Sequence, residues 1–370
     1  MPKNALFGNG LIIQYGGTRY TNARIIRRAL ETIRSGEFPE HLYPAECADF
    51  VQVLSGETRS VLMGAYDRFA FAGYEKAALD SFKSRYARSR RLAIEGIGFE
   101  DYFLLFELVY NKLGKTNPER FVCRGVLRRM FLDSIFDCGA IQEVHQRFPG
   151  GFLDWLSTFD LVFTTNYDGN LESAGAAEVL HLHGAFDVLS DVYDQDSFRN
   201  QLSDDLLDGE VVDWDYPHLY STCLVSYVSE LKSSSMEQAG QANRAMEKLA
   251  EAYKNDPKIS VDIDAWDGEA SLLSRMREAI QLKCSSPDLR HAEQYPTAKL
   301  SEASGKLSII GLSATNDSHV FDAISANDEI DAVEYYYFTK LEASMVSKLL
   351  ADKNLQFTNV RDLWNQLDEA

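Results

Sequence analysis

The stretch Leu307-Ser308-Ile309-Ile310-Gly311-Leu312-Ser313-Ala314-Thr315-Asn316-Asp317 carries the fold prediction. Its first four residues read as a strand buried inside a sheet, and the small polar residues from Gly311 onward end it. A helix through Phe321 and Ile324 follows, and Val333 to Phe338 is the next expected strand. Strands that alternate with helices in this way are typical of a parallel sheet with crossover helices.

The alternation continues to the end of the chain and is present at its beginning. After Val333–Phe338 the pattern predicts a helix from about Leu341 to Ala351, and a further apolar segment then leads into a last short helix around Leu363. At the other end, Ala5 to Phe7 is an expected strand that breaks at Gly8-Asn9-Gly10. A helix begins near Thr21, and a glycine at position 36 ends it.

Two long segments separate these parts of the sheet. Residues 37–150 have a helical pattern almost throughout, whereas residues 190–300 are acidic at first and then rich in Ser, Gln and Ala. Between them, Leu161–Thr165 and Val179–His183 are short strand-like runs. We therefore predict an α/β fold in which 1–370 form one domain: a Rossmann-like parallel sheet from about 1–36, 155–190 and 303–370, a large inserted helical module at about 37–150, and an insertion at about 190–300.

Composition limits the classes of ligand. The chain has 370 residues, 45% of them hydrophobic, with 21 Phe and 18 Tyr, which is ample for a packed core. Lys and Arg total 37 against 56 Asp and Glu, so the formal charge is -19. Such a chain repels phosphate backbones and anionic lipids, which makes nucleic acids and membranes poor candidate ligands. A small anionic dinucleotide remains possible, because backbone N–H groups can hold it.

The cysteines and the N-terminus point to an intracellular protein. The five cysteines are widely spaced and include no C-x-x-C pair, so we expect neither a disulfide framework nor a cysteine zinc site. No apolar run approaches the ~20 residues of a membrane span, and no signal peptide is recognisable. The expected location is the cytoplasm.

Four segments follow strands, where an open α/β sheet binds its ligands. In the first, Gly8-Asn9-Gly10, glycine would let the backbone approach a pyrophosphate and offer N–H groups to it. A turn that needs positive φ would look identical. The dehydrogenase pattern G-x-G-x-x-G is absent, because Leu11-Ile12-Ile13 follow Gly10.

The second segment is Thr164-Thr165-Asn166-Tyr167-Asp168, whose polar side chains suit either a ligand or an Asx-turn. The third contains His181 and His183, which would share a face if both lay on the strand, and Gly184, which suggests a tight turn. A two-histidine metal site is conceivable, but no third ligand is obvious.

The fourth segment contributes Gly311, Ser313 and Asp317. Small hydroxyl and carboxylate side chains at a strand end suit the hydroxyls of a ribose. They also suit helix N-capping, in which Asn316 or Asp317 would accept from the first turn of the next helix.

In order and placement, this set resembles the sirtuin-like superfamily, in particular its bacterial anti-phage defence branch of NADases, which includes the abortive-infection H-type proteins. The matching positions are Gly8-Asn9-Gly10, Thr164 to Asp168, His183-Gly184, and Gly311, Ser313 and Asp317. Residues 37–150 and 190–300 contain no matching motif.

The resemblance implies roles for these residues. Asn166 would hold the nicotinamide ribose and position a water molecule, and His183 would be the general base, with His181 as the alternative. The Gly8-Asn9-Gly10 loop would cradle the pyrophosphate, and Thr165 and Asp168 would also bind the cofactor. Ser313 and Asp317 would contact the adenosine-side ribose, and Gly311 would lie beside them. NAD would be the substrate, and no metal is expected.

Two departures from the family refine the expected reaction. Protein-deacylating sirtuins usually carry a four-cysteine zinc module, and this chain has no paired cysteines for one, so the expected acceptor is water rather than an acyl-lysine. The abortive-infection branch often has an acidic residue shortly after G-N-G, where this chain has Leu11-Ile12.

The expected function is therefore an NAD hydrolase that releases nicotinamide and ADP-ribose as a triggered effector of NAD depletion in anti-phage defence. Such an effector needs restraint, which implies a regulatory or sensor protein partner, such as a nucleotide-sensing subunit, or a homo-oligomer. The alternatives are a module that senses NAD or an ADP-ribose derivative without turnover, an NAD-dependent protein deacylase, and a dehydrogenase.

Three further features have simpler interpretations. The basic run Lys83, Arg85, Arg88, Arg90 and Arg91 indicates a solvated helix face more than a docking surface for an acidic partner. Glu100-Asp101 indicates the start of a helix, since acidic side chains favour its N-terminal dipole. Tyr335-Tyr336-Tyr337 indicates a strand with alternate residues buried, one ring of which could border an adenine.

Overall fold

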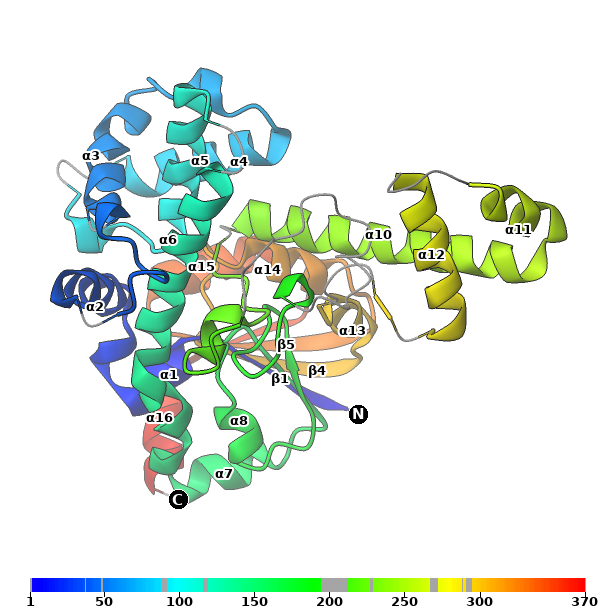
Figure 1. Cartoon of the computed structure of the whole chain (residues 1–370). Helices are drawn as coiled ribbons and strands as arrows, with labels where there is room; N and C mark the ends of the chain where they lie inside the picture. The colour runs from blue at the N-terminus through cyan, green and yellow to red at the C-terminus, as the bar shows by residue number, and fades with distance from the viewer. Residues whose placement is uncertain are drawn as a thin grey trace. The chain divides into compact units, whose positions relative to one another are not determined.

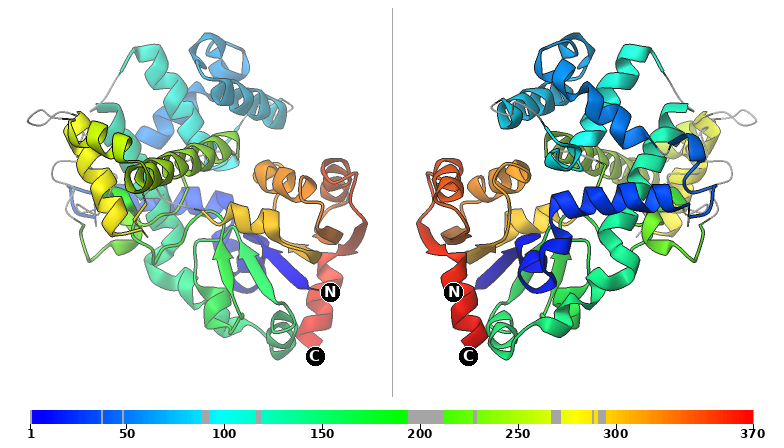
Figure 2. Two further views of the ribbon diagram at one scale, coloured as in Figure 1. Left: turned by 90° about the vertical axis from the view of Figure 1, so that its right-hand side faces the viewer. Right: turned by 90° about the vertical axis from the view of Figure 1, so that its left-hand side faces the viewer.

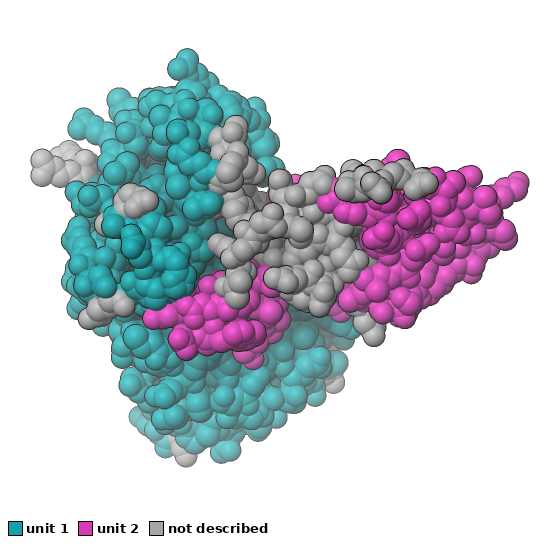
Figure 3. Space-filling model, viewed as in Figure 1, with its two compact units in different colours: residues 1–185, 223–232, 296–370 teal, residues 186–222, 233–295 magenta. Residues whose placement is uncertain are grey.

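The structure is a computed structural model that describes residues 2–36, 38–47, 49–87, 92–115, 119–193, 212–226, 229–266, 272–287, 289–290 and 295–369. The chain divides into two compact units, which Figure 3 distinguishes by colour. The first comprises residues 1–185, 223–232 and 296–370, and the second comprises residues 186–222 and 233–295.

The first unit contains a sheet of six parallel strands, which confirms the predicted α/β, Rossmann-like fold (Figure 1). In spatial order the strands are β3 (Val179–His181), β2 (Leu161–Thr164), β1 (Lys3–Phe7), β4 (Gly305–Ile310), β5 (Ile330–Tyr337) and β6 (Leu355–Asn359). This is the order of dinucleotide-binding doubly wound sheets, in which ligands bind where the order reverses, here between β1 and β4. The register places Phe7 level with Thr164 on one side and with Ile310 on the other, so these strands end together.

Helices cover both faces of the sheet (Figure 2). On one face, α14 (Ser318–Ser325) and α15 (Lys340–Leu349) pack on buried strand residues, as where Phe321 meets Tyr335 with ring centroids 6.1 Å apart. On the other face, α7 (Gly150–Leu156) places Phe152 and Trp155 against Phe7, each with centroids 6.1 Å from it. A strand buried on both faces needs side chains that tolerate burial in both directions, which explains the apolar runs Ala5–Phe7 of β1 and Ile309–Ile310 of β4.

The loop after β1 differs from the expectation. Gly8-Asn9-Gly10 leads directly into a short helix, α1 (Gly10–Gly16), which the strand-break interpretation did not anticipate. The next helix, α2 (Asn22–Ser35), begins after Thr21 and ends at Gly36, whose φ of 66° is left-handed, as predicted. At the C-terminus, α16 (Val360–Glu369) follows β6 without a gap.

The predicted helical module folds on the same unit. Its main helices are α3 (Phe50–Leu62), α4 (Gly73–Tyr86), α5 (Asp101–Leu113) and α6 (Glu119–Phe136), and α5 is buried along most of its length. Helices α5 and α6 pack against each other, with the rings of Phe103 and Phe131 5.9 Å apart. A short α8 (Asn170–Ser173) and α13 (Thr297–Glu302) also belong to this unit. The 3-10 helices among the described residues are Thr18–Tyr20, Ala45–Cys47, Asp67–Phe69, Ile94–Gly96, Asp137–Arg147, Asp191–Tyr193 and Pro217–Tyr220.

The second unit has its own small core. Most of α10 (Ser229–Asn255) lies in it, together with α11 (Pro257–Asp264) and α12 (Leu272–Ser285). The buried side chains of this core are Met246, Ile263, Ala279 and Ile280. Among the described helices, none is long and apolar enough to cross a membrane.

Candidate functional site

A cavity of about 790 Å³ lies where the loops after the strands of the first unit meet. Ligand pockets commonly have volumes of roughly 300–1,000 Å³. Nine of the ten predicted site residues line this one cavity: Asn9, Gly10, Thr165, Asn166, Asp168, His183, Gly311, Ser313 and Asp317. The tenth, Gly8, lies behind the lining, where its carbonyl accepts a hydrogen bond from Asn166 Nδ2 at 3.3 Å.

The glycines of the first loop serve a different purpose from the predicted one. Gly8 N–H donates to the Ile310 carbonyl at 2.8 Å, and Gly10 N–H donates to the Gly311 carbonyl at 3.0 Å. A Cβ atom on Gly10 would lie only 2.5 Å from Gly311 Cα. The prediction that these two N–H groups face a pyrophosphate is therefore wrong for this structure, because both are bonded to the loop after β4.

The alternative interpretation, a turn with positive φ, also fails for Gly8 and Gly10, since neither has one, whereas Gly311 has a φ of 69°. Close contact between two backbones is the physical reason for glycine here. The packing brings the ends of β1 and β4 together at the point where the strand order reverses.

Asn166 is fixed at the cavity wall by the end of β2. Thr164 Oγ1 donates to the Phe7 carbonyl at 3.1 Å and accepts from Asn166 N at 3.0 Å. Thr165 N–H also donates to the Phe7 carbonyl, at 3.0 Å. With its own Nδ2 bonded to Gly8, the Asn166 side chain has a single defined position, 8% exposed.

Asp168 fits both interpretations of its segment, an Asx-turn and a contact with a ligand. One carboxylate oxygen, Oδ1, accepts from the N–H of Asn170 at 3.3 Å and from its side-chain amide, which is an Asx-turn. The other oxygen, Oδ2, is buried and has no hydrogen-bond partner among the residues that the structure describes. Burial raises the pKa of Asp168 to about 6. A buried acceptor without a partner is costly, so a ligand donor would find a prepared site there.

The two predicted histidines have separate surroundings, contrary to the expectation that they share a face. Strand β3 ends at His181, and the chain turns at Gly184, whose φ is 83°, as the glycine suggested. His181 does not line the cavity: its Nδ1 lies 2.8 Å from the Asn166 carbonyl and its Nε2 lies 2.6 Å from Glu172 Oε1. Burial opposes protonation of His181, but the Glu172 carboxylate outweighs it and raises the pKa.

His183 lines the cavity and is 2% exposed. Its Nε2 lies 2.9 Å from Nε2 of His319, and the two rings are stacked with centroids 5.0 Å apart. Burial lowers the pKa of both imidazoles, that of His183 well below its usual value and that of His319 to about 3. Both rings are therefore uncharged at neutral pH, and one of them donates the proton between the two nitrogens. An uncharged imidazole is the form that can accept a proton.

The loop after β4 forms its own network. Ser313 Oγ lies 3.0 Å from Thr315 Oγ1 and accepts from Asn316 N at 3.3 Å. Asp317 occupies the N-cap position of α14, but its carboxylate makes no capping hydrogen bond, so the predicted capping role is wrong for this side chain. Burial raises the pKa of Asp317 to about 6, even though the ammonium of Lys232 favours the ionised form.

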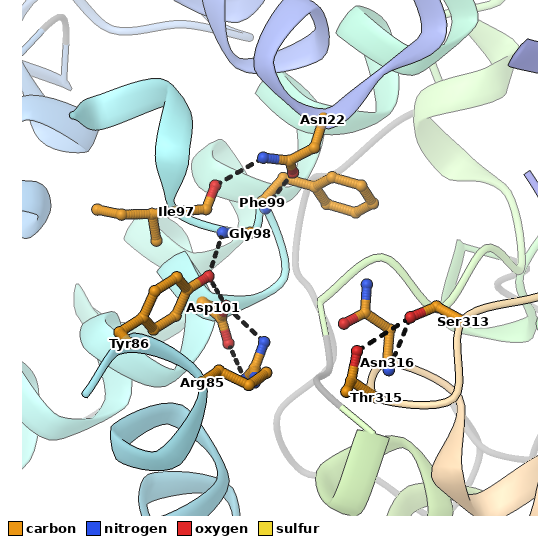
Figure 4. A network of polar contacts seen from close by, with 10 residues as sticks. All are labelled: Asn22, Arg85, Tyr86, Ile97, Gly98, Phe99, Asp101, Ser313, Thr315 and Asn316. Carbon is orange, nitrogen blue, oxygen red and sulfur yellow. Dashed lines mark hydrogen bonds and ion pairs between the residues drawn. The ribbon is translucent and has the colours of Figure 1, made fainter. Parts of the chain in front are cut away.

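The helical module forms an opposite wall that the sequence interpretation missed (Figure 4). Both terminal nitrogens of Arg85 donate to Asp101, at 2.9 and 2.6 Å, and Tyr86 Oη donates to the same carboxylate at 2.7 Å. Tyr86 Oη in turn accepts from Gly98 N at 2.8 Å. The interpretation of Arg85 as part of a solvated face is therefore wrong, and Arg88, Arg90 and Arg91 of the same run lie outside the described residues.

Glu100 and Asp101 start α5, as predicted, but they also face the cavity. Glu100 Oε1 lies 2.6 Å from Nζ of Lys232, a lysine that is only 1% exposed. Burial raises the pKa of Glu100 to about 7. Neither Lys232 nor His319 follows a strand, so the strand-end rule could not find them, although His319 lies two positions after the predicted Asp317.

Aromatic side chains from the C-terminal elements complete the lining. Tyr336, Phe338 and Trp364 all line the cavity, and the Arg361 guanidinium lies 4.5 Å from the centroid of Phe338. Tyr335 is fully buried instead and donates from its hydroxyl to the Leu312 carbonyl at 2.9 Å. The expected alternation of buried residues is not observed here, because the neighbouring Tyr335 and Tyr336 are both buried, and Tyr336 is the tyrosine of the three that borders the cavity.

The described residues include no group of three or more His, Cys, Asp or Glu side chains arranged to hold a metal ion. What the cavity does combine is a positioned amide, an uncharged imidazole, an unsatisfied carboxylate oxygen and aromatic rings. No protein-family model, curated protein or solved structure matches this chain.

Proposed function

We propose that the chain is an NAD hydrolase that cuts the bond between nicotinamide and ribose, and that its cavity is the active site. The observation that carries the proposal is the convergence of Asn166 and an uncharged His183 on one cavity at the switch point of a 3-2-1-4-5-6 sheet. Residues from four segments far apart in sequence meet there, in the order in which the sirtuin-like superfamily has them.

The cavity residues suit the chemistry of that reaction. When the glycosidic bond breaks, its electron pair leaves with nicotinamide and an oxocarbenium-like ribose remains. A water molecule then forms the new C–O bond, and its proton passes to an uncharged base, for which His183 is the candidate. Asn166, held by Gly8, would orient the ribose and the water.

Other lining groups suit the remaining parts of NAD. Asp168 Oδ2 is an acceptor in need of a donor, and the carboxamide of nicotinamide offers one. Aromatic rings such as Tyr336 and Phe338 suit the face of an adenine base. Because the N–H groups of Gly8 and Gly10 are already bonded, the pyrophosphate would need other donors.

In the cell, the proposed role is that of a triggered effector of NAD depletion in anti-phage defence. Uncontrolled hydrolysis of NAD would kill the host, so the proposal includes restraint by a regulatory or sensor partner or by self-assembly. This proposed role in defence rests on the resemblance in sequence motifs and not on a feature of the cavity.

The test is a chromatographic assay of nicotinamide and ADP-ribose with purified protein and NAD. We expect release by the wild type and a loss of at least ~100-fold in Asn166→Ala and His183→Ala, the usual size of a general acid–base contribution. Asn354→Ala, an exposed asparagine outside the cavity, is the matched control and should keep full activity. His181→Ala separates the two candidate bases, since loss there with retention in His183→Ala would reverse their assignment.

Calorimetric binding of NAD accompanies the assay, because an effector held inactive until its partner is added would bind NAD before it releases nicotinamide. Binding by the wild type that weakens in Asp168→Asn supports the cavity as the NAD site. Binding without nicotinamide release, even with partners added, would favour the sensing module. Absence of both binding and release would overturn the proposal.

A further inference from the structure

His319 contacts the proposed base, but the proposed mechanism gives it no role. Its Nε2 lies 2.9 Å from Nε2 of His183, and the two rings are stacked with centroids 5.0 Å apart. The two residues are 136 positions apart in sequence, so the fold makes this contact. A hydrogen bond between two nitrogens needs a proton on one and a lone pair on the other, so one ring is the donor and the other the acceptor.

The elements that carry the two rings are anchored in the first unit. His319 is the second residue of α14, whose Val320 and Phe321 are buried in the core beside the sheet. The carbonyl of His183 accepts from the N–H of Leu224 at 2.9 Å. Because both backbones are held, the hydrogen bond between the rings is a fixed feature of the site.

The ring of His183 has one nitrogen left for a ligand. Its Nε2 faces His319, and no hydrogen bond joins its Nδ1 to another residue that the structure describes. Since His183 lines the cavity, Nδ1 is the nitrogen available to a water molecule there. A general base needs a lone pair on the nitrogen that receives the proton. His183 can therefore act as a base only in the tautomer that carries its proton on Nε2.

Two features favour that tautomer. With the proton on Nε2, the N–H group of His183 is bonded to His319, whereas a proton on Nδ1 would leave a buried N–H with no partner among the described residues, which is costly. His319 also lies in the first turn of α14, where the helix dipole disfavours positive charge. Burial lowers the pKa of His319 to about 3, so this ring stays uncharged and can accept a hydrogen bond.

We propose that His319 is a positioning residue for the base: its Nε2 accepts the Nε2–H of His183, which fixes the tautomer of that ring and leaves a lone pair on Nδ1 for the attacking water. In the reaction the O–H bond of the water breaks, its electron pair stays on the oxygen that bonds to the ribose, and its proton binds Nδ1. The bond from Nε2–H to His319 then becomes charge-assisted and stabilises the imidazolium. The inference rests on the proposed function only in treating His183 as the base.

The test is ¹⁵N NMR of the full chain labelled with ¹⁵N-histidine, without NAD, because ring nitrogens with and without a proton have well-separated shifts. The signals of His183 are assigned by their loss in His183→Gln. The internal reference is His145, whose Nδ1 lies 2.9 Å from the Gln142 carbonyl and therefore carries a proton. The variants are His319→Gln, whose amide oxygen can still accept, and His319→Phe, which keeps a ring and removes the acceptor.

In the wild type and in His319→Gln we expect a proton on Nε2 of His183 and none on Nδ1. In His319→Phe the proton should move to Nδ1, because Nε2–H would lose its acceptor inside the protein. The signals of His145 should not change. In the nicotinamide assay, His319→Phe should lose on the order of 10- to 100-fold in rate with unchanged affinity for NAD, the size typical of residues that orient a histidine through its second nitrogen, and His319→Gln should keep most of the rate.

A proton on Nδ1 of His183 in the wild type would overturn the proposal. So would an unchanged tautomer in folded His319→Phe, or an equal change in His319→Gln, since packing would then be the cause. The wild-type spectrum decides the tautomer even if His319→Phe does not fold. Failure of the nicotinamide assay alone would count against the hydrolase and leave the direction of this hydrogen bond standing, because the tautomer is measured without NAD.

Discussion

At the scale of single residues, His183 and Asp317 show how one environment acts on a base and on an acid. Burial lowers the pKa of the imidazole and raises that of the carboxyl to about 6, since both shifts favour the uncharged form. The result is a cavity whose imidazole is unprotonated at neutral pH. The carboxyl groups of Asp168 and Asp317 titrate closer to neutrality than usual.

This shift has a consequence for stability that Asp317→Asn would expose. A carboxyl with a raised pKa in the folded state stabilises the fold while protonated, and that contribution is lost as pH rises through about 6. Asparagine cannot ionise. Compared with the wild type, Asp317→Asn should therefore have a higher free energy of unfolding at pH 7 than at pH 4, by on the order of 1 kcal/mol.

Denaturant unfolding at both pH values, with Asp322→Asn as the control, measures the effect. Asp322 is an exposed aspartate on the same helix, α14, so its substitution should change stability equally at both pH values. If the stability difference between Asp317→Asn and the wild type is the same at both pH values, the pKa of the Asp317 carboxyl is not raised in the folded state and the prediction is wrong.

At the scale of elements, the contact between the loops after β1 and β4 decides the shape of the site. Gly10 and Gly311 leave no room for a Cβ atom between the two backbones, and their main-chain groups are bonded to each other. A chain turn of ordinary residues would hold these strand ends apart. The short helix α1 begins at Gly10, directly at this contact.

We expect Gly10→Ala to destabilise the protein by about 2 kcal/mol or more, since the new Cβ atom would press on backbone that cannot yield cheaply. Gly56→Ala is the matched control. Gly56 lies inside α3 with open space around it, so alanine there should stabilise by about 0.5–1 kcal/mol. Thermal or denaturant unfolding gives both values, and a neutral Gly10→Ala would mean that the two loops separate easily.

At the scale of the whole molecule, the sheet order places the cavity. Because β1 and β4 are neighbours while their crossover connections leave in opposite directions, a crevice opens at their ends, and the helical module supplies α4 and α5 as its other wall. All of these parts belong to the first unit.

Hydrogen–deuterium exchange tests this placement if NAD is the ligand. Added NAD should slow exchange in peptides that cover residues 8–14, 165–170 and 311–318, where the cavity lining comes from three different loops. Exchange in α12 of the second unit serves as an internal reference and should not change. If exchange slows only in α12, or in none of the three loops, the ligand binds elsewhere.

The parallel sheet and most of the strand-end residues of the site could be predicted from the amino-acid pattern alone. Apolar runs such as Leu307–Ile310 must be buried on both faces, and alternation with helices permits little other than a parallel sheet. Ligand sites in such sheets lie at the carboxyl ends of the strands, so polar residues directly after a strand could be identified by position alone.

The rest of the cavity lining and the protonation state of its groups depend on how the chain packs. Arg85, Glu100 and Lys232 belong to helices that reach the cavity through long-range packing, which no local pattern records. The bonding of Gly10 to Gly311 and the pairing of His183 with His319 join residues far apart in sequence. The physical reason is that burial and proximity, which set protonation and free hydrogen-bonding capacity, are properties of the folded chain.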